Sequence, residues 1–245
     1  GPLNNFILGI LTFILFFFLQ GGVPDVTTNQ VTVTDGGALQ AAGVETGVRI
    51  LEINGQQVSD YKDVSNILAQ VNEKAKEAPV LNLLVEEDGK EKTLQVTTIK
   101  DQGYFRLGVS PYLKTGFVET IVGGFQEAGA TALLIVNALK NIIASFDVKQ
   151  LGGPVAIYNV SSQAAEGGIL PVLRLLAMLS INLGIFNLIP IPALDGGKIL
   201  INLIEAIRRK PLKQEIESYI TLVGVAIMVV LMLVVTWNDI MRVFF

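Results

Sequence analysis

The sequence predicts a multi-pass α-helical membrane protein with a small α+β domain inserted between its spans. Apolar residues make up 51% of the 245 residues and charged residues only 16%, whereas charged residues come to about a quarter of an ordinary soluble domain. Three long runs are almost free of charge, and the stretch between the first and second runs alternates polar and apolar residues like strands. These observations together predict bilayer helices interrupted by a water-exposed domain.

The first apolar run covers residues 3–19 and lies within a transmembrane span predicted at residues 1–22. It carries no charge, and it would cross a hydrocarbon core of about 30 Å if it extended slightly upstream. A secretory signal peptide would need a starting Met, a basic leading region and a small-residue cleavage site. The chain begins Gly-Pro without them, so we interpret the run as a span and expect further residues to precede it.

Two more spans are predicted, at residues 169–205 and 218–240. The loop between them, residues 206–217, contains Arg208, Arg209, Lys210 and Lys213. Lys and Arg clusters beside membrane helices mark the cytoplasmic side, so this basic loop should be cytoplasmic. The long stretch between the first two spans would then be extracytoplasmic. We therefore expect a multi-pass protein of the cell membrane, that is, the plasma or inner membrane.

Residues 115–168 are predicted to form an amphipathic helical region at the membrane surface. Apolar residues recur at helical intervals over residues 115–145. Asn137, Lys140 and Asn141 would be costly in the middle of a bilayer, which favours an interfacial position. A fourth span in this region is the alternative.

Residues 26–111 are predicted to form the inserted domain. Strand patterns occur at residues 31–34 and 49–53, and helical spacing at residues 61–71 with Ser59 or Asp60 as the N-cap. Two further strands, at residues 80–86 and 91–99, flank Asp88-Gly89. This dipeptide supplies the positive φ angles of a tight hairpin turn, so a hairpin is predicted there.

Absent residue types exclude several functions. With no cysteine, the chain has no disulfide framework, thiolate metal site or cysteine nucleophile. With no histidine it has no Ser-His-Asp triad and no histidine-rich metal site, so hydrolytic chemistry would need groups from elsewhere. The net charge of −4 and the scattered cations offer no basic stripe, so nucleic acid is not an expected partner.

The second predicted span is interrupted by prolines, glycines and one carboxylate. Pro190 and Pro192 remove backbone donors, and membranes tolerate such non-helical backbone only where it lines a protein cavity. Asp195 would cost about 2.5–3.5 kcal/mol at mid-bilayer unless it faced an interior with a partner. Taken alone, these residues fit a functional site and an ordinary span end with a solvated Asp195 about equally.

A resemblance to a known family separates these alternatives. The string Asn187-x-x-Pro190-x-Pro192-x-Leu194-Asp195-Gly196-Gly197 resembles the signature of the site-2 proteases, which are intramembrane zinc metalloproteases. Residues 1–6, 153–157 and 204–211 also resemble family segments, so the likeness covers essentially the whole chain. It points to the bacterial branch with one PDZ domain, typified by anti-sigma-factor and pheromone-processing proteases. The resemblance implies that Asp195 is a zinc ligand and that Asn187, Pro190 and Pro192 hold an unwound substrate segment.

The same resemblance implies that part of an active site is missing. The family's histidine ligands and general-base Glu come from an H-E-x-x-H helix in its first span, and this motif is absent here. We therefore expect no catalytic residue in this chain and a zinc site that needs ligands from a missing N-terminal span. Lys198, after the glycine pair, departs from the common family pattern, and nothing mechanistic follows from it.

The predicted function is intramembrane metalloendopeptidase, present here as a fragment that is inactive alone. Its substrates would be single-span membrane proteins or signal-peptide remnants. The alternative is a non-catalytic, membrane-anchored PDZ protein that binds client peptides.

The inserted domain resembles a PDZ domain of the bacterial protease type. The resemblance rests on residues 36–44 followed by 49–58, although Gly47-Val48 stands where the family usually has Gly-Asp. Such a domain can bind a peptide C-terminus at a sheet edge, or it can act only as a size filter over the entrance, and the sequence leaves both open. The full prediction is a multi-pass α-helical membrane protein with an inserted α+β PDZ-like domain.

Overall fold

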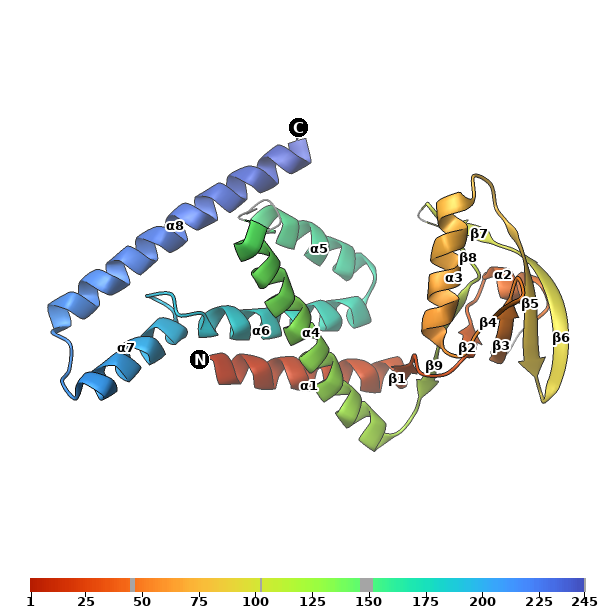
Figure 1. Cartoon of the computed structure of the whole chain (residues 1–245), viewed down its shortest axis with the longest axis horizontal. Coiled ribbons are helices and arrows are strands. Elements are labelled where there is room, and N and C mark those ends of the chain that lie inside the picture. The colour runs from red at the N-terminus through yellow and green to blue at the C-terminus, as the bar shows by residue number, and fades with distance from the viewer. Residues whose placement is uncertain (45–46, 102, 146–151, 245) are drawn as a thin grey trace. The chain divides into compact units, whose positions relative to one another are not determined.

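The computed structural model describes residues 1–44, 47–101, 103–145 and 152–244 (Figure 1). The chain divides into two compact units, one formed by residues 1–20 with 120–245 and the other by residues 21–119. The first is helical and the second is an α+β domain inserted between two membrane-type helices. The predicted fold class, a multi-pass α-helical membrane protein with an inserted α+β domain, is confirmed.

The helical unit is built from long apolar helices. Its helices are α1 (Pro2–Gln20), α4 (Phe117–Ser145), α5 (Pro154–Glu166), α6 (Ile169–Leu188), α7 (Asp195–Arg208) and α8 (Gln214–Phe244). Four helices in the described part of the chain, α1, α4, α6 and α8, are long and apolar enough to cross a membrane. A surface position for α4 stays a prediction.

Helices α1 and α6 run antiparallel and lie side by side (Figure 1). A Cβ on Gly9 would lie only 2.6 Å from Cδ1 of Ile181, and the Ser180 hydroxyl donates to the Asn5 carbonyl at 2.8 Å. Small residues and hydroxyl bonds of this kind drive helix association in membranes, where lipid removes the hydrophobic incentive. Because of this pairing, the end of α6 lies beside the beginning of α1.

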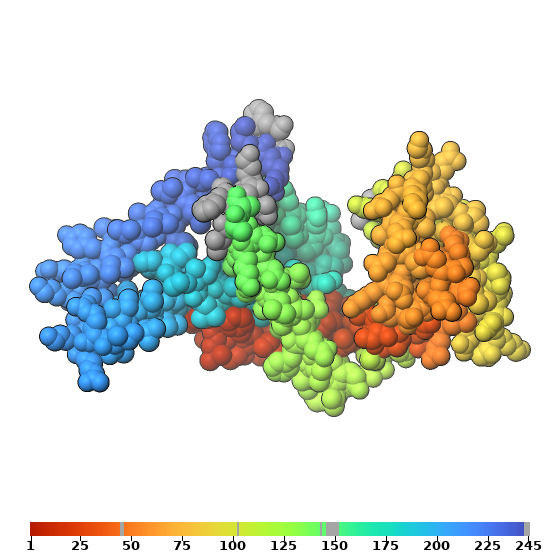
Figure 2. All heavy atoms as spheres, viewed as in Figure 1, coloured from red at the N-terminus to blue at the C-terminus, as the bar shows by residue number. Residues whose placement is uncertain are grey.

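Helix α8 forms one edge of the helical unit (Figure 2). Most of its large apolar side chains are exposed, including Leu222 at 64% and Val230 at 60%. Such a surface would be unfavourable in water, and it suits contact with lipid chains.

The inserted domain is a mainly antiparallel sheet covered by a helix. The strands are β1 (Val23–Asp25), β2 (Gln30–Val33), β3 (Val48–Ile53), β4 (Gln56–Gln57), β5 (Val80–Glu87), β6 (Lys90–Thr97), β7 (Ile99–Asp101), β8 (Tyr104–Arg106) and β9 (Val109–Lys114). The main sheet has the order β1-β9-β2-β3-β5-β6, β4 pairs with β3, and β7 and β8 form a separate pair. Helices α2 (Ala38–Ala41) and α3 (Tyr61–Lys74) complete the domain.

Local signals in the sequence predicted two of these elements well. Helix α3 begins after Asp60, whose carboxylate accepts a bond from the Asp63 amide at 3.0 Å. The β5–β6 hairpin turns at Asp88 and Gly89, both with positive φ, as a type I′ turn requires. The N-cap and the hairpin are therefore confirmed.

Candidate metal-ligand and peptide-binding sites

The backbone between α6 and α7 is a turn of six residues, 189–194. The Ile189 amide donates to the Phe186 carbonyl at 3.1 Å, the Leu194 amide donates to the Ile191 carbonyl at 3.1 Å, and Ala193 has a positive φ of 83°. Two prolines within the turn have no amide to satisfy. The predicted interruption of the second apolar run is confirmed, and its backbone donors are largely bonded within the turn.

Asp195 is the first residue of α7, and its side chain lies close to Gly1, just before α1. A Cβ on Gly1 would be 3.1 Å from Oδ2 of Asp195, and the Asp195 side chain is partly exposed. The positive end of the α7 macrodipole favours a negative charge at this position. The α1–α6 pairing thus places one partly exposed carboxylate beside the start of α1.

The two glycines after Asp195 allow α7 to pack directly on the turn. Both are buried, and a Cβ on Gly196 would lie 2.6 Å from the Leu188 carbonyl carbon. A Cβ on Gly197 would lie 2.8 Å from the Ile191 carbonyl carbon. Real Cβ atoms essentially never approach backbone so closely. The Gly-Gly pair therefore sets the position of Asp195 against the turn.

The other residues predicted for this site lie in the same segment. Asn187 is half-buried in the last turn of α6, Pro190 is exposed and Pro192 is half-buried. Within the part of the chain that the structure describes, the Asn187 amide makes no side-chain hydrogen bond. The four residues predicted for this site therefore lie in the last turn of α6, in the turn that follows it and at the start of α7, and their roles stay predictions.

These residues supply only part of a zinc site. Catalytic zinc takes three protein ligands and keeps one position for water or substrate. Over residues 1–44, 47–101, 103–145 and 152–244, no group of three His, Cys, Asp or Glu side chains could hold a metal. Asp195 fits one carboxylate ligand, and further ligands would have to come from outside these residues.

An apolar cavity of 570 Å³ adjoins the Asp195 turn. It is walled by Pro154 of α5, Phe186 of α6, Leu194 of the turn, and Met228 and Val235 of α8. Sequence reasoning missed the contribution of α8. A glycine and an aspartate within that apolar run, Gly224 and Asp239, were the available signals.

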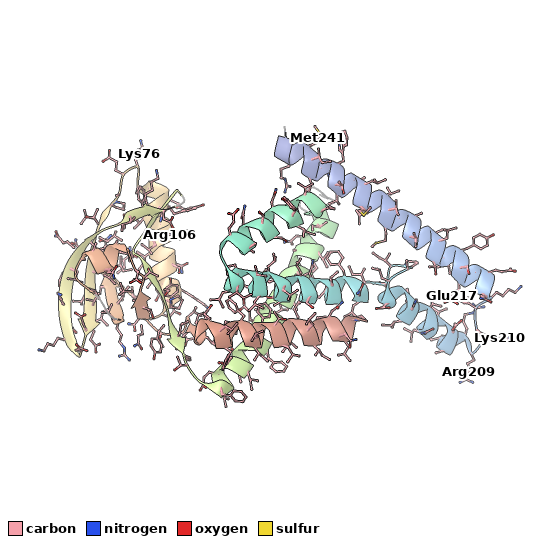
Figure 3. All side chains as sticks on the ribbon, turned by 180° about the vertical axis from the view of Figure 1, so that it is seen from behind. Lys76, Arg106, Arg209, Lys210, Glu217 and Met241 are labelled. Carbon is pink, nitrogen blue, oxygen red and sulfur yellow. The ribbon has the colours of Figure 1, made fainter. Side chains whose placement is uncertain are left out.

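The inserted domain has its own cavity, of 670 Å³, beside the start of β9. Tyr61 and Leu68 of α3 form one wall, and Arg106, Gly108 and Val109 lie opposite (Arg106 is labelled in Figure 3). The Tyr61 hydroxyl donates to the Val109 carbonyl at 3.2 Å, and burial raises the pKa of Tyr61. The sequence did not identify these groove residues, since they come together only in the folded sheet.

Strands β1 and β2 pair with successive parts of β9. Strand β1 pairs with residues 112–114 of β9, from Val23↔Lys114 to Asp25↔Tyr112, whereas β2 pairs with residues 109–111. Asp25 is buried and its carboxylate pairs with the Lys114 ammonium at 2.9 Å.

Fold and site together define a multi-pass membrane protein whose broken apolar helix presents a carboxylate at a helix start. The family model described as Peptidase family M50 matches residues 1–231, and the chain belongs to that family. The predicted resemblance to the site-2 proteases is confirmed by this match.

Several curated proteins are similar to the whole chain. A candidate zinc metalloprotease of Streptococcus pneumoniae is 54% identical over 245 residues, and one of Lactococcus lactis is 51% identical. A candidate protease of Enterococcus faecalis, Eep, is 44% identical over 250 residues. All three alignments cover 100% of this chain, which spans only 56–58% of the length of these relatives.

A solved structure is also similar to part of the chain. The PDZ domain of an SdrC-like protein from Listeria innocua aligns with a TM-score of 0.29 and 16% identity, over 38% of this chain and 96% of that domain.

Proposed function

We propose that this chain supplies the Asp195 part of the active site of an intramembrane zinc metalloendopeptidase. The observation that carries the proposal is the carboxylate at the start of α7, placed beside α1 by a broken membrane-type helix, in a chain of peptidase family M50. Zinc at such a site lowers the pKa of a bound water to about 7 and polarises the scissile carbonyl. Asp195 would provide one ligand, and the other ligands and the general base would come from the length of the relatives that this chain does not cover.

The residues around Asp195 would hold the substrate. A membrane helix keeps its backbone bonds internal, so it must be unwound locally before a peptidase can reach a peptide bond. The side-chain amide of Asn187, which has no hydrogen-bond partner among the described residues, can bond an unwound strand. The prolines 190 and 192 keep the adjacent turn from closing into helix. The substrates we propose are single-span membrane proteins or signal-peptide remnants.

Replacement of Asp195 in the full-length protein tests this assignment. Asp195→Ala should reduce cleavage of a membrane-embedded peptide to background and lower the zinc bound per protein, while membrane insertion is unchanged. Lys198→Ala is the matched control, because Lys198 lies exposed in the same first turn of α7. Full activity in Asp195→Ala would contradict the assignment of Asp195 as a zinc ligand.

The same proposal includes an orientation. The connection between α7 and α8 presents Arg209 and Lys210 outward (Figure 3), and such cations favour the cytoplasmic side. The inserted domain would then be extracytoplasmic in the cell membrane. A protease-accessibility assay on spheroplasts would test this, since cleavage at the Arg209 loop from outside would reverse it.

A second candidate function is peptide binding without catalysis, which the 670 Å³ groove beside Tyr61 and Leu68 favours. The groove would hold a peptide C-terminus, or the domain would only exclude large substrates. If the domain only excludes large substrates, deletion of residues 31–111 in the full-length protein should relax the demand for pre-trimmed substrate, and an unchanged size limit would refute the filter. Leu68→Lys distinguishes a peptide-binding groove from a size filter, because it should change substrate selection only if the groove binds peptide. Gln70→Ala, on the exposed face of α3, is its control.

A further inference from the structure

Helix α8 touches the Asp195 turn through Gly224. A Cβ on Gly224 would overlap the Pro192 carbonyl and lie 2.7 Å from the Pro192 Cβ. Glycine weakens the interior of a helix relative to alanine, so its place in the middle of α8 needs a compensating contact. The turn cannot easily absorb such an overlap by a local change of backbone, because Pro192 has a ring-fixed φ and Ala193 already holds a positive φ, so a push at Pro192 would shift the turn as a whole.

The same helix makes a second polar contact about four turns further along, at Asp239. This side chain is 3% exposed, and its Oδ2 accepts bonds from the Gly153 amide at 2.8 Å and the Ala156 amide at 3.0 Å. The carboxylate therefore caps the N-terminus of α5, where the helix dipole also favours it. A buried carboxylate persists in an apolar helix only when it is paired in this way.

These two contacts hold opposite ends of one continuous segment. Asp239 holds the start of α5, α5 leads into α6, and Gly224 meets the turn that follows α6. The 570 Å³ cavity lies between the two contacts, so few side chains pack there to fix the spacing. The two contacts therefore hold α8 against this segment on either side of the cavity.

We propose that α8 positions the Asp195 carboxylate, with Gly224 and Asp239 as positioning residues. A side chain at 224 would push the Pro192 backbone, and the push would pass to α7 because Gly197 packs on the Ile191–Pro192 segment. Asp195 lies two residues before Gly197, so it would move with the first turn of α7. The proposal rests on the proposed peptidase function for its consequence in catalysis, but the contact itself is testable without activity.

The test uses the full-length protein with Gly224→Ala, Gly224→Val, Asp239→Asn and Asp239→Leu. The control is Gly129→Ala in α4, where an added Cβ meets nothing within 4 Å. Because these 245 residues contain no cysteine, Leu194→Cys can report on the turn by its rate of maleimide labelling, once any cysteine elsewhere in the protein is replaced. Cleavage of a membrane-embedded peptide gives kcat and KM, and a thermal melt checks folding.

Gly224→Val should lower kcat by about 100-fold with a smaller change in KM, since misplacement by about 1 Å has that effect. It should also change the labelling rate of Leu194→Cys several-fold, and Gly129→Ala should change neither. Asp239→Asn should keep most activity because its amide oxygen still accepts both bonds, whereas Asp239→Leu should not. This rescue by the amide distinguishes a positioning contact from a requirement for charge.

Unchanged kcat and labelling in the folded Gly224→Val protein would overturn the proposal. Equal losses in Asp239→Asn and Asp239→Leu would remove Asp239 from it. If the wild-type protein cleaves no peptide, the peptidase function fails, and the labelling rates alone decide whether α8 holds the turn.

Discussion

Asn72 should be the most sensitive polar residue of the inserted domain. From α3, its side-chain amide donates to the Phe105 carbonyl at 3.0 Å, and its carbonyl accepts from the Phe105 amide at 2.6 Å. The side chain thus replaces a neighbouring strand for β8, whose Phe105 is only 6% exposed. Leaving a buried donor or acceptor unpaired costs about 1–3 kcal/mol. Loss of two such bonds in Asn72→Ala should therefore cost about 2–4 kcal/mol, a large part of the stability of a small domain.

Urea unfolding of the inserted domain, within the full chain and as residues 21–119, would measure this loss. Gln70→Ala on the exposed face of α3 is the control and should change stability by less than about 0.5 kcal/mol. Asn72→Asp should lose less than Asn72→Ala, because a carboxylate can still accept from the Phe105 amide although it cannot donate to the Phe105 carbonyl. A loss below about 0.5 kcal/mol for Asn72→Ala would refute the reasoning that Asn72 substitutes for a strand.

Two further predictions concern packing and pH. Gly9→Val should destabilise the α1–α6 pair by about 1–3 kcal/mol, because the added carbons meet the buried Ile181, and a lower melting temperature in detergent would show it. Burial raises the pKa of Asp25, but hydrogen bonds from Thr27 and the Lys114 ammonium outweigh burial and hold it below its usual value of 3.8. A carboxylate whose pKa is lowered by folding contributes stability that is present above pH 3.8 and is lost as pH falls below it. Asp25→Asn should therefore make the domain's free energy of unfolding less dependent on pH in acid, and an unchanged pH dependence would contradict this.

Features encoded by neighbouring residues could be predicted from the sequence. The Asp60 cap and the Asp88-Gly89 turn depend on backbone within three residues, so the local chemistry decides them. The apolar runs predicted α1, α6 and α8 because bilayer length and absence of charge act on each run separately. The break before Asp195 was visible since proline and glycine act on their own backbone.

Contacts between distant residues could not be predicted in this way. Asn72 bonds a residue 33 positions away, and Asp239 caps a helix whose first amide is 86 positions away. Both partners are backbone groups, which every residue has, so the identity of the partner residue does not reveal the contact. The groove at Tyr61 is similar, because its opposite wall comes from β9, at the other end of the domain. A buried acid in an apolar helix signals that a partner exists, but the fold alone identifies it.

The Asp195 site depends on backbone packed against backbone. Its turn presents carbonyl groups in apolar surroundings, where an exposed peptide group is costly. Three glycines, Gly196, Gly197 and Gly224, each bring a helix into contact with this turn, at positions where a single methyl group would collide with backbone. Helices α7 and α8 therefore each contact the turn at glycines, where the helix itself places no side chain in between. It follows that the first carbon added at any of these glycines should disturb Asp195 more than the loss of a neighbouring apolar side chain, which only enlarges the cavity beside it.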